Sequence, residues 1–126
     1  MKIISSKVHG LLDYATVVFL LAAPTIFKME ETLCTITYVL AVVHFALTAL
    51  TAFEVGLVKI IPFKLHGVIE IVVAAVLGGV AFWFSNNDNA LGFYFYAGLA
   101  IVIMIVFLLT DFKSGKRIDS SDRGLN

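Results

Sequence analysis

The chain is poor in charge and has almost no cysteine. Only 14% of its 126 residues are charged and 60% are hydrophobic, giving a mean hydropathy of +1.00, whereas soluble domains carry about 25% charged residues. The one cysteine, Cys34, excludes an internal disulfide and a cysteine-based zinc or iron–sulfur site within one chain. The formal net charge is zero, so no basic bias indicates nucleic acid as a partner. These absences favour an integral membrane protein.

The sequence also lacks the short motifs of several enzyme classes. It has no glycine-rich phosphate loop, no Ser-His-Asp spacing and no two-residue alternation typical of barrel strands. Instead it has apolar runs at residues 8–27, 32–53, 65–84 and 90–110. A helix of about 20 residues crosses the hydrocarbon core of a bilayer. We therefore predict an all-α, integral membrane four-helix bundle, with the lipid bilayer as its partner.

One segment of the sequence occurs twice. Residues 7–13, Lys-Val-His-Gly-Leu-Leu-Asp, return as residues 64–70, Lys-Leu-His-Gly-Val-Ile-Glu, at an offset of 57 (64 − 7). Glu54 and Asp111 obey the same offset (111 − 54). Because the first copy is repeated inside the chain, we expect it to be a retained helix and not a cleaved signal peptide.

The repeat divides the chain into two predicted helical hairpins. The first hairpin comprises residues 1–54 and the second residues 64–111, with an interfacial linker at 55–63 and a disordered cytoplasmic tail at 112–126. Both hairpins begin on the same side of the membrane, as in parallel repeats related by an axis along the membrane normal.

Positive charges predict the orientation. Only Lys28 falls on one side of this four-span arrangement, and the other side carries Lys2, Lys7, Lys59, Lys64, Lys113, Lys116, Arg117 and Arg123. By the positive-inside rule, both termini and the linker are predicted to be cytoplasmic.

Small residues line one face of the third run. Ala74-Ala75 and Gly78-Gly79 are four residues apart, and small residues let membrane helices approach closely. Two interpretations stay open, namely packing inside the bundle and a homo-oligomer interface.

Ionisable residues gather near the cytoplasmic ends of the predicted helices. His9 and Asp13 are four residues apart and share a helix face, as do His66 and Glu70. A carboxylate below the headgroups costs on the order of 2–3 kcal/mol unless it finds a partner. The glycines after each histidine would let another backbone come close. The candidate residues for binding a proton or cation are His9, Asp13, Glu54, His66, Glu70 and Asp111.

Three interpretations of this cluster stay open. In the first, each histidine hydrogen-bonds its own carboxylate, and the carboxylate also favours the positive end of its helix dipole. In the second, His9, Asp13, His66 and Glu70 hold a divalent metal; the donors resemble those of di-metal carboxylate bundles, although the Glu-x-x-His spacing is absent. In the third, the carboxylates carry a proton or cation, linked to transport, and the histidines act as relays.

His44 is expected to stand apart from this cluster. It lies ten residues before Glu54 (54 − 44), or about 15 Å along a helix, close to the bilayer centre, and the repeat places Ile101 opposite it. We expect a neutral core histidine bonded to a hydroxyl such as that of Thr48 or Tyr38. A haem ligand or a mid-membrane proton relay is the alternative.

Two segments resemble a known family. Residues 8–14, Val-His-Gly-Leu-Leu-Asp-Tyr, followed by Ala-Ala-Pro at 22–24, are similar to the SPW-repeat family of small bacterial membrane proteins, and residues 54–62 resemble the linker of its duplicated members. The Ser-Pro-Trp motif is not retained: residues 23–25 keep only the proline and residues 80–82 keep none of it. The resemblance implies a four-helix protein of the bacterial cytoplasmic membrane and supplies no established activity.

From these observations we predict a small membrane protein whose cluster binds a proton or cation. The alternatives are a metal- or haem-binding redox accessory protein and a structural partner subunit without chemistry.

Overall fold

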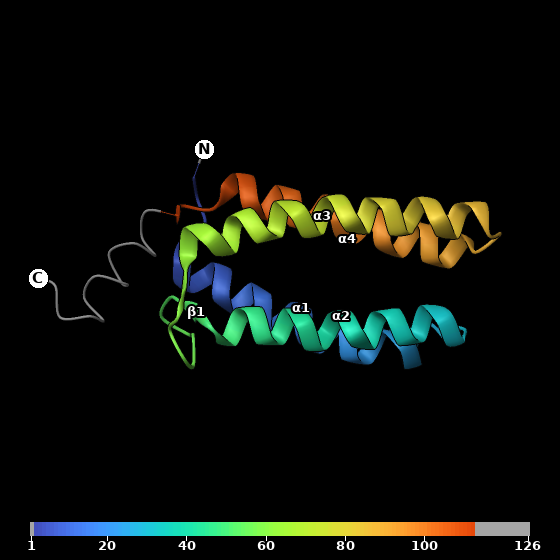
Figure 1. The fold of residues 1–126 in the computed structure, drawn as a ribbon, viewed down its shortest axis with the longest axis horizontal. Helices are drawn as coiled ribbons and strands as arrows, with labels where there is room; N and C mark the ends of the chain where they lie inside the picture. Colours follow the sequence, from blue (N-terminus) through green and yellow to red (C-terminus); the bar gives the residue numbers. More distant parts are fainter. Residues whose placement is uncertain (1, 113–126) are drawn as a thin grey trace, which may run out of the picture.

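The computed structural model describes residues 2–112, which form an all-α bundle (Figure 1). Its four helices are α1 (Ser6–Ile26), α2 (Glu31–Ala49), α3 (Phe63–Asn86) and α4 (Ala90–Leu109). Each helix is long and apolar enough to span a membrane, which confirms the predicted fold class. The predicted tail, 112–126, lies outside the described residues except for Phe112.

The outer surface of the bundle is apolar. Large side chains such as Val18, Phe82 and Ile101 are 66%, 67% and 60% exposed. Soluble monomers rarely expose a continuous apolar surface of this kind. Lipid tails, in contrast, match it, and all backbone groups of the helix interiors are already paired within each helix.

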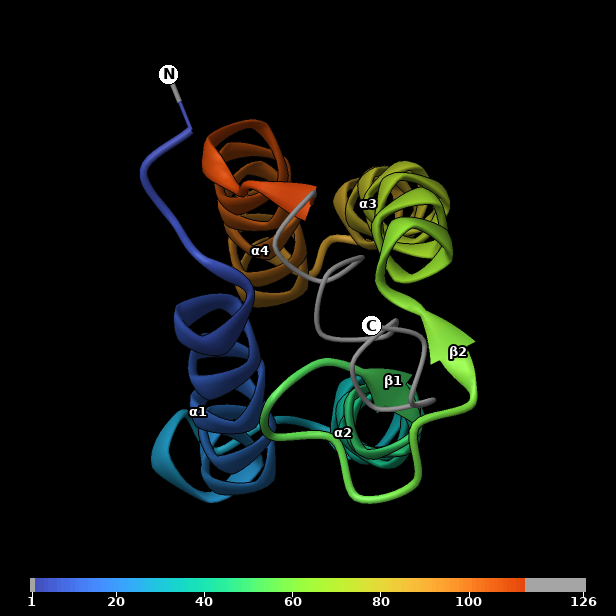
Figure 2. The same ribbon diagram turned by 90° about the vertical axis from the view of Figure 1, so that its left-hand side faces the viewer.

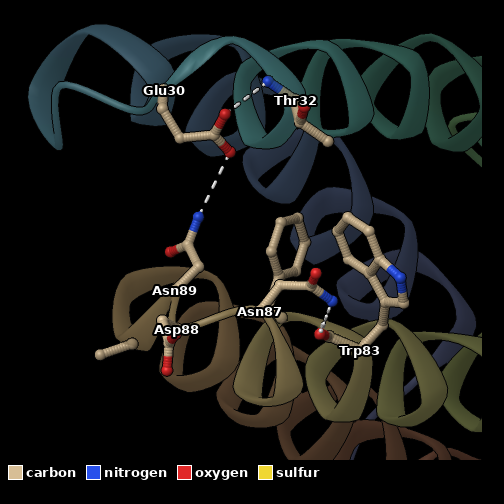
Figure 3. Close-up of a pocket in the computed structure, with 8 residues that line it drawn as sticks. Glu30, Thr32, Trp83, Asn87, Asp88 and Asn89 are labelled. Atoms are coloured by element: carbon tan, nitrogen blue, oxygen red, sulfur yellow. Dashed lines mark hydrogen bonds between the residues drawn. The ribbon is translucent and has the colours of Figure 1, made fainter.

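Polar side chains begin the helices and connect the two turns at one end of the bundle. Glu30 precedes α2 and accepts hydrogen bonds from the backbone N–H groups of Thr32 (2.8 Å) and Leu33 (2.7 Å). Asn89 precedes α4 and accepts from the N–H of Gly92 at 2.8 Å. The Asn89 side chain also donates to Glu30 at 3.2 Å (Figure 3). These side chains thereby satisfy two of the N-terminal amides of α2 and one of those of α4.

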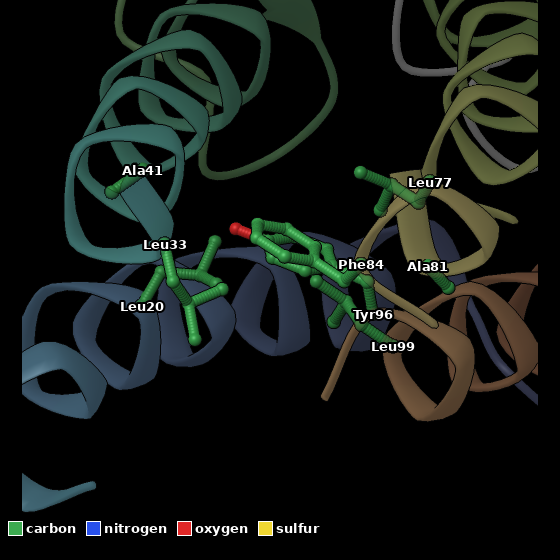
Figure 4. Close-up of a cluster of buried hydrophobic side chains, with 8 residues drawn as sticks. All are labelled: Leu20, Leu33, Ala41, Leu77, Ala81, Phe84, Tyr96 and Leu99. Carbon is green, nitrogen blue, oxygen red and sulfur yellow. The ribbon is translucent and has the colours of Figure 1, made fainter. Parts of the chain in front are cut away.

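The two hairpins face each other across a shared core. In the end view α1 and α3 occupy one diagonal of the bundle, and α2 and α4 occupy the other (Figure 2). Between them, the hydroxyls of Thr37 on α2 and Tyr96 on α4 are 2.7 Å apart. The apolar side chains of this core come from all four helices (Figure 4) and are Leu20, Leu33, Ala41, Leu77, Ala81, Phe84, Tyr96 and Leu99.

Two short parallel pairings join the hairpins at the other end. Strand β1 (Thr51–Ala52) follows α2 and pairs with β2 (Ile61–Pro62), which leads into α3. Ile4, before α1, forms an isolated parallel bridge with Thr110, after α4. Each pairing connects the start of one hairpin to the end of the other. The sequence analysis did not predict these strands, because two-residue strands carry no periodic signal.

The pairings show that the spacing of the repeat changes within the hairpins. Ile4 and Ile61 occupy equivalent positions at an offset of 57 (61 − 4), whereas their partners Thr51 and Thr110 are 59 apart (110 − 51). The offset grows because α3 has 24 residues and α1 has 21, while the turn after α3 is shorter. Thr37 and Tyr96 are also 59 apart (96 − 37), so their hydrogen bond joins equivalent positions.

The small residues of α3 divide between inside and outside. Ala74 is buried at 5% exposure, which fits packing within the bundle. Gly78 and Gly79 are exposed, and a methyl group added to either would meet no atom within 4 Å. Internal packing therefore does not account for the glycine pair, and the predicted homo-oligomer interface stays a prediction.

Candidate cation site

Four of the predicted site residues converge inside the bundle. His9 and Asp13 come from α1, and His66 and Glu70 come from α3 on the same diagonal. One ligand atom from each lies within 4.8 Å of the other three. Both histidine side chains are fully buried and both carboxylate side chains are only 6% exposed. The i, i+4 spacing puts each pair on one helix face, and the pseudo-twofold arrangement turns the two faces toward each other.

The ligand atoms form a ring in which nitrogen and oxygen alternate. His9 Nε2 lies 3.2 Å from Glu70 Oε1 and 3.5 Å from Asp13 Oδ2. His66 Nε2 lies 3.1 Å from Asp13 Oδ2 and 3.3 Å from Glu70 Oε1. Each histidine is thus closer to the carboxylate of the other hairpin than to the one on its own helix. Pairing within one helix, the first of the predicted interpretations, describes only half of the contacts.

In both histidines, Nδ1, the ring nitrogen that faces away from the carboxylates, contacts a threonine hydroxyl. Thr51 Oγ1 lies 2.7 Å from His66 Nδ1, and Thr110 Oγ1 lies 2.8 Å from His9 Nδ1. Both threonines follow the last turn of a helix, α2 or α4. The threonine that contacts each histidine therefore belongs to the opposite hairpin, and each half of the site needs both hairpins.

The threonines determine which histidine nitrogen carries hydrogen. A hydroxyl has one proton, and each of these hydroxyls donates it to a helix carbonyl at 2.6 Å, that of Leu47 for Thr51 and that of Val106 for Thr110. The threonine oxygen can then only accept from the imidazole, so Nδ1 bears hydrogen in both rings. This assignment follows from the hydrogen-bond network. In a neutral ring it leaves the lone pair on Nε2, the atom that faces the carboxylates.

In neutral rings the Nε2 lone pairs would therefore face carboxylate lone pairs at the centre of the site. The 3.2 Å contact between His9 Nε2 and Glu70 Oε1 is a hydrogen bond only when that ring is protonated. Asp13 Oδ2, His66 Nε2 and Glu70 Oε2 are buried and have no hydrogen-bond partner. Buried acceptors without a partner are costly, and ionised ones far more so. With both carboxylates ionised and both rings neutral, the net charge is −2. Two protons or one divalent cation would balance it.

Aromatic rings close the end of the site. Phe53 and Phe63 are 0% and 2% exposed, and the Phe63 ring centroid lies 5.3 Å from that of His9. A methyl group on Gly67 would come within 2.7 Å of the Phe112 ring, and one on Gly10 within 3.0 Å of the Phe53 ring. The predicted role of the glycines, admitting another backbone, is thus wrong, because they admit side chains: the Phe112 ring at Gly67, and Val55 together with the Phe53 ring at Gly10. These rings keep the dielectric around the cluster low, which strengthens its electrostatics.

The two outer acidic residues lie elsewhere. Glu54 accepts from the Ser6 hydroxyl at 2.7 and 3.0 Å. Asp111 follows the bridge at Thr110, where its backbone N–H donates to Ile4 O at 2.8 Å. Neither belongs to the converging group found among the described residues.

His44 is not separate from the cluster, contrary to the prediction. Its Nε2 lies 3.6 Å from Asp13 Oδ1, and its side chain is 11% exposed. The expected hydroxyl partner is also wrong, because Thr48 donates to the backbone carbonyl of His44 and the Nε2 atom has no hydrogen bond. The depth was measured from Glu54, but α2 already ends at Ala49. His44 is therefore about 8 Å from the helix end, a depth comparable to that of Asp13 in α1.

Thr51 and Thr110 are the site residues that sequence reasoning missed. At the uniform offset of 57, Thr51 aligns with Leu108 (51 + 57), so the pair does not appear as a repeat. An offset of 59 over the second half of each hairpin would have revealed it.

Comparisons with protein-family models, with curated proteins and with solved structures give no match for this chain. The resemblance to the SPW-repeat family stays a prediction. The fold and the buried cluster together define a small, multi-pass membrane protein with a candidate cation site inside its helical bundle.

Proposed function

We propose that this chain is a cation-binding protein of the bacterial cytoplasmic membrane, and that His9, Asp13, His66 and Glu70 hold one divalent cation. The observation that carries the proposal is the convergence of the two Nε2 atoms. Thr51 and Thr110 orient them toward two carboxylate oxygens at 3.1–3.5 Å. Neutral imidazole and carboxylate are both metal donors, and one divalent cation would cancel the net charge of −2.

Burial makes the balancing charge necessary. The cluster lies between helices whose outer faces meet lipid, and an unbalanced charge at that depth is expensive. A cation coordinated by all four residues would also connect α1 to α3, and hence one hairpin to the other. Binding would therefore stabilise the folded protein by mass action. A role in transport would need the ion to leave again on the cytoplasmic side, where the positive charges place this end of the bundle.

The competing assignment is a cluster of ion pairs in which two protons take the place of the cation. The separations of 3.1–3.5 Å also suit hydrogen bonds between imidazolium and carboxylate. That cluster would be structural and would bind no metal.

Metal content separates the two assignments. The protein is purified in detergent without chelators, offered Zn²⁺, Mn²⁺, Mg²⁺ or Ca²⁺ in turn, and the bound metal per chain is measured by mass spectrometry. The variant Asp13→Asn, Glu70→Gln removes both charges. Its amide N–H groups can donate to the Nε2 lone pairs, so we expect it to fold. Glu54→Gln is the matched control, because that carboxylate lies at the same end of the bundle outside the cluster.

We expect one divalent ion per chain in the natural protein and in Glu54→Gln, and none in the double variant. A folded natural protein that binds none of the four ions would refute the proposal in favour of the ion pairs.

A further inference from the structure

We infer that the cluster is a four-coordinate, tetrahedral site selective for Zn²⁺-like transition metals over Mg²⁺ and Ca²⁺. This inference rests on the proposed function, because it names the class of cation that the same four residues would take. It follows from the distances between ligand atoms, from the donor types and from the burial of the four side chains.

The four nitrogen–oxygen distances are close to the edge length of a tetrahedral metal site. A tetrahedral ion with ligands at 2.0–2.1 Å holds neighbouring ligand atoms about 3.3 Å apart, whereas a square-planar ion with the same bond lengths holds adjacent ligands about 2.9 Å apart. The four nitrogen–oxygen separations are 3.1, 3.2, 3.3 and 3.5 Å. These four separations lie close to the tetrahedral value. The two remaining pairs, nitrogen with nitrogen and oxygen with oxygen, lie within 4.8 Å and would close to about 3.3 Å around a tetrahedral ion.

The donors exclude the hard cations. Ca²⁺ takes six to eight oxygen ligands and Mg²⁺ keeps several waters in an octahedral shell. Here two of the four ligand atoms are imidazole nitrogens, which suit Zn²⁺, Fe²⁺, Co²⁺ and Ni²⁺. Both histidine side chains are fully buried and the carboxylates are 6% exposed, so the shell is closed to the waters that an octahedral ion would need. A closed shell of four protein ligands is typical of structural zinc sites.

The hydrogen bonds between the threonines and the Nδ1 atoms of the two histidines are also typical of a zinc site. Metal-binding histidines usually donate their second ring N–H to an oxygen, which fixes the ring and makes the ligating nitrogen more basic. Thr51 and Thr110 supply those oxygens at 2.7 and 2.8 Å. Because each threonine comes from the hairpin opposite to its histidine, the ligand geometry depends on how the two hairpins are docked.

Cobalt tests the inference directly. The full-length protein in detergent is stripped with a chelator and titrated with Co²⁺, and its visible spectrum is recorded. Four-coordinate Co²⁺ absorbs strongly in the visible region, whereas six-coordinate Co²⁺ absorbs weakly. We expect one Co²⁺ per chain with intense bands, displaced by one equivalent of Zn²⁺ and unaffected by a large excess of Mg²⁺ or Ca²⁺. His66→Gln should lose the intense bands, and Glu54→Gln should keep them.

The possible failures are distinguishable. A weak, six-coordinate spectrum, or displacement of Co²⁺ by Mg²⁺ or Ca²⁺, would overturn the tetrahedral transition-metal assignment and leave the proposed cation site standing. Absence of Co²⁺ binding together with Mg²⁺ or Ca²⁺ binding would do the same. Absence of binding by every ion would overturn this inference and the proposed function together. The spectrum of the natural protein decides the matter even if His66→Gln does not fold.

Discussion

The two threonines offer the sharpest test of how the site is built. Replacing Thr51 by valine keeps the shape of the side chain and removes the oxygen that lies 2.7 Å from His66 Nδ1. The buried Nδ1–H then has no acceptor, which costs about 1–3 kcal/mol of folding free energy in the metal-free protein. Loss of the oxygen that accepts from a metal-binding histidine weakens metal binding about 10- to 100-fold, equivalent to about 1.4–2.7 kcal/mol. Thr110→Val should act equally on His9.

Thr48, in the last turn of α2 just before Thr51, provides a matched control. It is fully buried, like Thr51, and its hydroxyl also donates to a helix carbonyl four residues earlier, that of His44, at 2.8 Å. Thr48→Val therefore removes a hydrogen bond of the same type, from a threonine hydroxyl to a helix carbonyl, and leaves both contacts to an imidazole Nδ1 in place. The difference between Thr51→Val and Thr48→Val isolates the threonine–histidine contact. Thr51→Ser should restore binding, since it keeps the hydroxyl.

The assay is competition for Zn²⁺ against a chromogenic chelator, in detergent, with thermal unfolding of each metal-free variant in parallel. We expect Thr51→Val to lose at least tenfold in affinity relative to Thr48→Val. Equal affinities would show that the hydroxyl does not orient His66, and the assignment of the Nε2 lone pair would fall with it.

Three further predictions concern packing, the core and topology. Gly67→Ala places a methyl group 2.7 Å from the Phe112 ring and should destabilise the protein by about 1–3 kcal/mol, whereas Gly79→Ala meets open space and should be neutral or stabilising in thermal unfolding. Tyr96→Phe removes the 2.7 Å bond to Thr37 and should cost about 1 kcal/mol in the same measurement. In a Cys34→Ser background, a membrane-impermeant thiol reagent applied to intact cells should label Asp88→Cys and leave Lys59→Cys unlabelled; the reverse pattern would invert the proposed orientation.

The pattern of the sequence predicts much of the fold because the bilayer restricts it. Apolar runs of the spanning length must be helices, since lipid leaves no other way to pair backbone groups. The same argument placed His9 and Asp13, and their copies His66 and Glu70, on inward faces, because buried charge must find a partner. The convergence of these four residues is therefore predictable from spacing and cost alone.

The places where the helices end could not be predicted from the sequence, and the positions of Thr51 and His44 depend on them. The second apolar run continues to residue 53, but α2 stops at Ala49 so that Thr51 can enter β1. Hydropathy does not register this change, because strand and helix residues are equally apolar here. Because α2 ends at Ala49, the chain turns so that Thr51 contacts His66, and His44 lies at about the same depth in the bundle as Asp13. The misplaced His44 and the missed Thr51 both follow from this early end, whereas Thr110 was missed because the offset of the repeat changes from 57 to 59.

His44 departs from the twofold arrangement, and this makes it testable as an accessory group. At the offset of 59 its counterpart is Ile103 (44 + 59), so the fold accepts an aliphatic side chain at the equivalent position. Its Nε2 approaches Asp13 Oδ1, at 3.6 Å, whereas Oδ2 is the atom shared by the two other histidines.

We therefore expect His44→Ile to fold and to reduce Zn²⁺ affinity by less than about tenfold, the loss expected when a ligand loses its hydrogen-bond partner. His66→Gln, which removes a ligand, should reduce it far more. The measurement is the same chelator competition, with thermal unfolding as the check on folding. If His44→Ile binds as poorly as His66→Gln, the ion is held by five residues and the twofold repeat does not define the site. If it binds normally, four ligands from two equivalent helices are sufficient, and His44 acts on the far oxygen of a carboxylate that is already coordinated.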